Sequence, residues 1–170
     1  MADQKINLPA EAETTEIATE ETTLFATFYF GDHFFGLPID EVIEINRALE
    51  ITPVPKAPPY VAGVVNLRGQ ILTAINLAHR IGLQCGEEKA TNSLNNVIIG
   101  HREEPVSLLV ERIGDVMSIP VSQIEPPPAM IEGVDIQYVR QVCKLPGQLL
   151  IILDSEELQK PPEEHHKQDV

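Results

Sequence analysis

Apolar residues in this chain come in short runs, about five residues each, separated by glycine, proline, asparagine or charged positions. Most of the runs are rich in β-branched and aromatic side chains, which suit the half-buried, pleated surface of a sheet. The pattern therefore predicts an all-β domain rather than a helical one. The expected strands cover residues 24–30, 34–37, 42–48, 64–67, 71–75, 96–100, 106–110, 116–119, 139–145 and 149–153.

Two short helices are expected, each directly after an apolar strand. Asn76 can cap a helix over residues 77–81 that Gly82 ends, and Asp154 can cap a helix over residues 155–159 that stops before a pair of prolines. Side chains of this type accept hydrogen bonds from the free N–H groups of the first turn, and glycine or proline ends the helix. Neither helix is long enough for a coiled coil.

A weak internal repeat relates the two halves of the chain. RGQILTAINLAHRI, beginning at Arg68, aligns with PGQLLIILDSEELQ, beginning at Pro146, as a turn, a strand, a capping residue and a short helix. Pro-rich loops, TPVPKAPP and EPPPAM, precede the two copies. The repeat indicates two copies of one small β unit, although similarities this short also arise by chance among amphipathic strands.

The acidic residues are concentrated at the two ends of the chain. Within a net charge of −14, the first 22 residues hold six acids and one lysine, and residues 154–170 hold six acids and two lysines. Because both ends carry little to bury, they are typical of solvated tails. The sequence predicts a disordered acidic tail over residues 1–22, a folded domain over residues 23–158 and a disordered tail over residues 159–170.

Deleting residues 1–22 and 160–170 is expected to change the free energy of unfolding by no more than about 0.5 kcal/mol, the range typical of surface changes. Denaturant unfolding of the full and trimmed chains measures the difference. A larger loss would show that a tail packs on the folded domain.

Charge and composition argue against several classes of protein. Nucleic acid and anionic lipid are bound mainly through clustered Lys and Arg, which this acidic chain lacks. No membrane insertion is expected, because no apolar run is long enough to span a bilayer and the N-terminal segment lacks an apolar stretch. Cys85 and Cys143 show no metal-ligand spacing; the alternatives are one bridge between them or two reduced thiols, and we favour reduced thiols. Together these features indicate a cytoplasmic protein.

No catalytic or cofactor motif is present. The histidines stand outside HExxH, and GxSxG, GxGxxG and GxxxxGK[ST] are all missing. The expectation is a protein without a cofactor, a metal or enzymatic activity, in which any function rests on binding.

Residues 51–75 are the segment with the clearest local structure. Its prolines predict a stiff extended loop, and Pro59 to Ala62 can form one helical turn. Asn66-Leu67-Arg68-Gly69 then predicts a hairpin turn in which Gly69 takes a positive φ. Arg68 is either an exposed charge at the hairpin tip or a guanidinium positioned to pair with a carboxylate.

Three segments resemble the CheW family. They are G-V-V-N-L-R-G-Q-I-L from Gly63, with the prolines and the V-I-E-I from Val42 before it, L-F-A-T-F-Y-F-G-D-H-F-F-G-L-P-I-D-E-V from Leu24, and L-L-V-E-R-I-G-D-V-M-S-I-P from Leu108. The resemblance covers residues 24 to about 158. It implies two intertwined five-stranded SH3-like β-barrels with short helices, in agreement with the internal repeat.

Members of the family are non-catalytic adaptors. The resemblance therefore implies that the chain couples chemoreceptors (methyl-accepting chemotaxis proteins) to a CheA-type histidine kinase in two-component signal transduction. The implied partners are the regulatory domain of the kinase and the cytoplasmic tip of the receptors, at receptor arrays on the inner face of the membrane, with a monomer in isolation. The implied receptor groove, between the barrels, comprises Val42, Glu44, Gly63, Val65, Asn66, Leu67, Arg68 and Gly69.

The alternative class is a small β-barrel that binds nucleic acid. Such a protein needs a basic groove with exposed aromatic residues, whereas this chain has no Trp and three Tyr.

One departure from the family pattern is Ala74-Ile75-Asn76-Leu77, where many relatives have P-[IV]-[IV]-D-L. This departure puts the local rigidity or a partner contact in doubt.

A specific ion pair is expected between Glu44 and Arg68. Alternation along a strand places Ile43 and Ile45 on one face and Glu44 on the other. If the isoleucines face the core, Glu44 points toward the groove, where its carboxylate can fix the direction of the Arg68 guanidinium.

Overall fold

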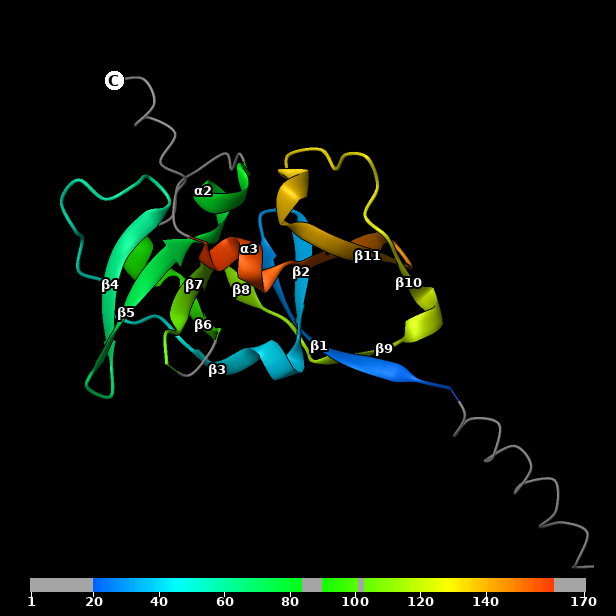
Figure 1. Cartoon of the computed structure of the whole chain (residues 1–170), viewed down its shortest axis with the longest axis horizontal. Coiled ribbons are helices and arrows are strands. Elements are labelled where there is room, and N and C mark those ends of the chain that lie inside the picture. The colour runs from blue at the N-terminus through cyan, green and yellow to red at the C-terminus, as the bar shows by residue number, and fades with distance from the viewer. Residues whose placement is uncertain (1–19, 84–89, 101–102, 161–170) are drawn as a thin grey trace, which may run out of the picture.

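The structure is a computed structural model that describes residues 20–83, 90–100 and 103–160. These residues form two sheets that lie side by side, with the short helices at their junction (Figure 1). The all-β class and the pairing of two β units are confirmed. The strands are β1 (Thr22–Phe30), β2 (His33–Pro38), β3 (Val42–Asn46), β4 (Val61–Leu67), β5 (Gln70–Asn76), β6 (Asn95–Ile99), β7 (Val106–Val110), β8 (Arg112–Ile113), β9 (Met117–Pro120), β10 (Ile124–Glu125), β11 (Val139–Leu145) and β12 (Gln148–Leu153).

The first sheet is built from the middle of the chain. Its five strands have the order β3-β6-β7-β5-β4. All neighbours are antiparallel except β5 and β7, which are parallel.

The second sheet has seven strands and draws on both ends of the folded part. Its order is β10-β11-β12-β2-β1-β8, with β9 also paired to β1. Strand β2 runs parallel to β12, so the N-terminal hairpin completes a sheet made otherwise of C-terminal strands. The chain thus enters and leaves through the same sheet, which confirms the intertwined arrangement.

The two sheets repeat one pattern of strands. In each, a hairpin (β4-β5 or β11-β12) leads into a short helix and pairs in parallel with the second strand of another hairpin (β6-β7 or β1-β2). A short segment also pairs with the outer strand of each hairpin. In the first sheet, Thr52 forms a bridge with Val64 of β4; in the second sheet, β10 pairs with β11. This topology supports the internal repeat. The second sheet has seven strands where five were expected, and closure of each sheet into a barrel stays a prediction.

The core is continuous across both sheets. One large cluster of buried side chains includes Phe28 and Phe35 from the second sheet together with Leu72 and Leu108 from the first. A smaller cluster lies on the other face of the second sheet, around Phe34. Each unit alone would have a marginal core, so the sharing of side chains stabilises the two sheets together.

The helices agree with the sequence prediction. Helix α2 (Leu77–Ile81) has Asn76 as its N-cap, whose side chain accepts a hydrogen bond from the His79 N–H, and it ends at Gly82 with φ 75°. Helix α3 (Ser155–Gln159) has Asp154 as its N-cap. Single 3-10 turns occupy η1 (Ile39–Glu41), η2 (Thr91–Ser93), η3 (Val121–Gln123) and η4 (Ile136–Tyr138).

Two strands were missed and one local prediction was wrong. Strands β8 and β10 were missed, because two-residue strands leave no periodic signal. The helical turn expected from Pro59 to Ala62 is a simple turn, closed by a hydrogen bond from the Val61 N–H to the Pro58 carbonyl, and β4 already begins at Val61.

The folded part extends slightly beyond the predicted tail boundaries. Thr22 belongs to β1 and pairs with Pro120, and Gln159 belongs to α3. The Lys160 carbonyl accepts a hydrogen bond of 2.6 Å from Arg80, which also lies 4.1 Å from the ring centre of Tyr60. The deletion test is therefore sharpest when it removes residues 1–19 and 161–170, whose predicted disorder lies outside the described residues. Within those described, no helix is long and apolar enough to cross a membrane.

Candidate protein-binding surface

The predicted ion pair between Glu44 and Arg68 is present. Arg68 Nη1 donates to Glu44 Oε2 at 2.5 Å, and Nη2 donates to Oε1 at 2.8 Å. Two parallel N–H···O bonds of this kind fix the plane of the guanidinium as well as its position. The Arg68 side chain is nevertheless 71% exposed, against 24% for Glu44, so the pair lies on the surface.

The backbone of the β4-β5 hairpin positions Arg68. Leu67 pairs with Gln70, which leaves a two-residue turn in which Arg68 has φ 52° and Gly69 has φ 86°. Two positive φ values are typical of a type I′ turn, whose twist matches that of the strands. The Asn66 side chain closes the turn by accepting a hydrogen bond from the Gly69 N–H at 2.9 Å. Gly69 behaves as predicted, and Arg68 itself takes the left-handed conformation.

A β-bulge changes the faces of β3. Val42 pairs with Ile99 and Glu44 with Ile98, so Ile43 has no partner of its own in the ladder. A bulge shifts the alternation of side chains by one position. Val42 and Ile43 both pack against the core, whereas Ile45 is 39% exposed. The prediction that Ile43 and Ile45 share one face was wrong, and the condition that both face the core holds for Ile43 alone.

The ion pair borders an open hollow of about 280 Å³ on the five-stranded sheet. We call it the hairpin hollow. It brings together three of the predicted residues, Glu44, Leu67 and Arg68, with neighbours on β5 and β6. Its remaining lining residues are Ile43, Gln70, Leu72, Ile98 and Pro105.

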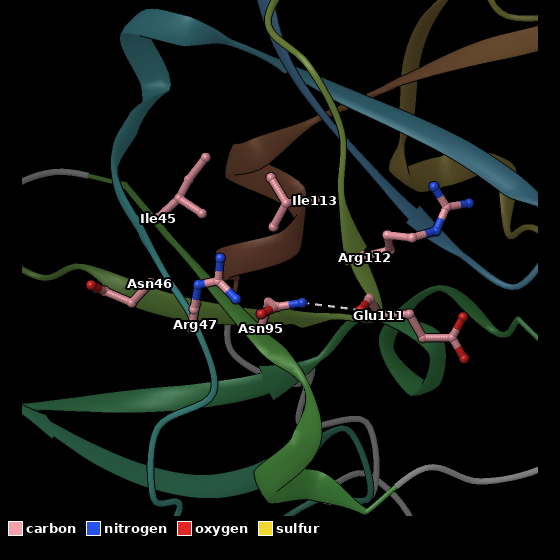
Figure 2. A pocket seen from close by; sticks show the side chains of 7 residues that line it. All are labelled: Ile45, Asn46, Arg47, Asn95, Glu111, Arg112 and Ile113. Carbon is pink, nitrogen blue, oxygen red and sulfur yellow. Dashed lines mark hydrogen bonds between the residues drawn. The ribbon is translucent and has the colours of Figure 1, made fainter.

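A second hollow, of about 420 Å³, lies where the two sheets meet (Figure 2). We call it the inter-sheet hollow. The end of β3, the start of β6 and the β7-β8 corner contribute to it, and none of the eight predicted residues is among its lining. Sequence reasoning missed this site. The lining residues are Ile45, Asn46, Arg47, Asn95, Glu111, Arg112 and Ile113.

Three of the predicted groove residues support the surface from beneath. Val65 is 1% exposed and belongs to the large core, and Val42 packs against that core. Gly63 is buried, and a Cβ built on it would lie 2.2 Å from the Thr52 carbonyl oxygen. Gly63 and Val65 thus have a structural role beneath the surface, and their contact with a partner stays a prediction.

The pKa of Glu44 is lowered, chiefly by the hydrogen bonds from Arg68; desolvation opposes them, and charge attraction by Arg68 and a hydrogen bond with Asn46 lower the pKa further. Because the pKa of Glu44 is lower in the folded state, the pair's contribution to stability is fully present above the unfolded pKa. That contribution is lost as the pH falls through the folded pKa. We expect a carboxyl NMR titration to give Glu44 a midpoint below the ordinary glutamate value, and Arg68→Ala to raise it. Lys144→Ala, remote from the pair, should leave the midpoint unchanged; an unshifted midpoint in the unmodified protein would contradict the pairing.

This surface has features of a protein-binding site: exposed hollows and a fixed surface ion pair suit contact with another macromolecule. No group of three or more His, Cys, Asp or Glu residues that could hold a metal occurs in the described part of the chain. The chain belongs to the CheW family: the CheW-like domain matches residues 24–161, which is nearly all of the folded part.

Individual relatives agree with this assignment. The chain is 32% identical over 149 residues to the chemotaxis protein CheW of Treponema pallidum, which covers 83% of this chain and 88% of the relative. It is 30% identical over 142 residues to the chemotaxis protein CheW of Bacillus subtilis, covering 84% and 88%. The crystal structure of the scaffolding protein TtCheW from Thermoanaerobacter tengcongensis superimposes with a TM-score of 0.71 at 27% identity, covering 79% of this chain and 90% of that one. The family is thus one of chemotaxis scaffolds.

Proposed function

We propose that this chain is a non-catalytic adaptor that couples chemoreceptors to a CheA-type histidine kinase. The observation that carries the proposal is the match of the CheW-like domain to nearly the whole folded part of the chain. An adaptor acts by holding two partners in a defined geometry, so that a conformational change in one biases the other through differential contacts. Its place of action follows from those partners: receptor arrays at the inner face of the membrane, with the chain a monomer until it binds.

The receptor is proposed to bind at the β4-β5 hairpin and the two hollows beside β3. Glu44 holds Arg68 in one direction on an exposed surface, as a recognition residue requires. Preorganised side chains lose less entropy when a partner binds.

The kinase is proposed to bind at exposed apolar residues on the other sheet. Leu24, Ile39 and Val116 are 47%, 36% and 55% exposed, and we call them the β1 patch. Phe25 pairs with Pro38 on one side and with Met117 on the other, so the residues one step along, Ile39 and Val116, flank β1. Exposed apolar side chains on neighbouring segments are a feature of protein interfaces, so we propose these three residues as part of the kinase contact.

Docking to the kinase is expected to be largely apolar and therefore insensitive to salt. Affinity for the regulatory domain of a CheA-type kinase should fall by less than about tenfold between low and moderate ionic strength, because screening weakens charge pairs but not apolar contacts. Calorimetric titration at two salt concentrations measures this. A fall of several orders of magnitude would show that charge dominates the contact.

The paired variant Leu24→Asp with Val116→Asp locates the contact. It should weaken kinase binding by about a hundredfold or more, because two carboxylates would have to be desolvated. Thr73→Asp, on the other sheet and also exposed, is the matched control. Equal binding by the double variant and the unmodified chain would place the kinase elsewhere.

A further inference from the structure

Arg47 places its guanidinium in the inter-sheet hollow. It follows β3 directly and is exposed, and Figure 2 shows its side chain directed between Ile45 and Asn95 toward Ile113. Among the described residues it makes no side-chain hydrogen bond and no ion pair, unlike Arg68, Arg80 and Arg140. A guanidinium that no described carboxylate engages, in a chain of net charge −14, is available to a partner from outside.

Buried polar side chains fix the backbone of Arg47. Asn96 Nδ2 donates to the Arg47 carbonyl at 3.2 Å, while Asn96 Oδ1 accepts a hydrogen bond of 2.7 Å from Ser107 Oγ. Asn96 and Ser107 are both 0% exposed. Burying such groups is unfavourable unless they are hydrogen-bonded, and this arrangement satisfies them while holding the peptide that carries Arg47 at the rim of the hollow.

The neighbouring charges are already engaged and do not neutralise Arg47. Glu111 Oε1 accepts a hydrogen bond from the Gly31 N–H at 2.8 Å, and in Figure 2 its carboxylate points away from Arg47. Glu44 is held by Arg68 on the other side of the strand. The Arg112 guanidinium lies 3.8 Å from the ring centre of Tyr29 and also points away. In the described lining of the hollow, Arg47 therefore remains as a guanidinium with neither a carboxylate nor a ring partner, beside Ile45 and Ile113.

We propose that Arg47 recognises a carboxylate of the receptor segment that occupies the inter-sheet hollow, and so selects receptors that carry an acidic residue beside apolar ones. The inference rests on the proposed adaptor function. Charge complementarity identifies the occupant: the planar fork of Arg47 suits a bidentate carboxylate, and Ile45 and Ile113 suit apolar side chains next to it. Receptors without an acidic residue at this position would leave the guanidinium unpaired at a closed interface, which weakens binding.

The test measures binding of the full chain to a purified cytoplasmic receptor fragment. Arg47→Glu should weaken binding by about tenfold or more, and Arg47→Lys should retain part of the affinity, because it keeps the charge but not the fork. Lys144→Glu, an equal change of charge at a 75% exposed lysine on β11, should leave binding unchanged. In a series of receptor fragments in which each acidic residue is replaced by lysine in turn, one replacement should restore binding to Arg47→Glu.

Several results would overturn the inference. If the unmodified chain binds the fragment while Arg47→Glu binds equally well, or if no lysine replacement restores binding, Arg47 does not recognise a receptor carboxylate. If Arg47→Glu binds more tightly and removal of residues 1–19 has the same effect, the acidic partner is the chain's own N-terminal segment. Failure of the unmodified chain to bind any receptor fragment would instead contradict the adaptor function itself.

Discussion

Substitution of Gly63 by alanine is expected to lower the free energy of unfolding by about 3 kcal/mol or more. The new Cβ would lie 2.2 Å from the Thr52 carbonyl oxygen, a backbone atom that cannot move alone. Thr52 exchanges two hydrogen bonds with Val64, of 2.9 and 2.8 Å, so relief of the clash would detach the Pro-rich loop from β4. Denaturant unfolding followed by circular dichroism measures the loss.

Gly69→Ala is the matched control for this substitution. Gly69 also has a positive φ, 86°, but a Cβ there would meet no atom within 4 Å. Its cost should be limited to the strain of the left-handed conformation, about 1 kcal/mol. Equal losses in the two variants would show that the contact with Thr52 is unimportant.

Arg68→Glu is expected to reduce receptor affinity by about tenfold or more while changing the melting temperature little. The pair is exposed, so its loss leaves the core intact, but it removes the positioned guanidinium and sets two carboxylates side by side. Glu44→Arg should behave alike. Receptor-fragment binding and thermal unfolding, measured on the same samples, separate the two effects.

The double swap, Glu44→Arg with Arg68→Glu, distinguishes pairing between the two residues from direct contact of Arg68 with the receptor. Recovery of part of the affinity would show that the two residues act mainly on each other. No recovery would show that Arg68 itself contacts a receptor carboxylate. Normal binding by both single variants would reduce Arg68 to an ordinary charge at a hairpin tip.

Local features of this fold could be predicted from the sequence where one residue type determines one geometry. Asn76 and Asp154 cap their helices as expected, because the first-turn N–H groups have no partner within the helix and these short side chains can accept hydrogen bonds from them. Gly69 takes the predicted positive φ for the same kind of reason. The ion pair between Glu44 and Arg68 was also predicted, but it needed the family resemblance to bring together two residues 24 positions apart.

Features that depend on the partners of a strand could not be predicted. The bulge at Ile43 arises from the pairing of β3 with β6, and the sequence of β3 alone predicts the opposite face for Ile45. The inter-sheet hollow likewise exists only because the β7-β8 corner meets the end of β3, about 65 residues away in the chain. Arg47 was missed for this reason.

The central claim is that this chain joins two partners through two separate surfaces. Sedimentation of the full chain with a CheA-type regulatory domain and a receptor cytoplasmic fragment tests it directly. We expect one ternary complex, from which Arg68→Glu removes only the receptor fragment and Leu24→Asp with Val116→Asp removes only the kinase domain. Competition between the two partners for the chain, or no binding of either, would contradict the claim.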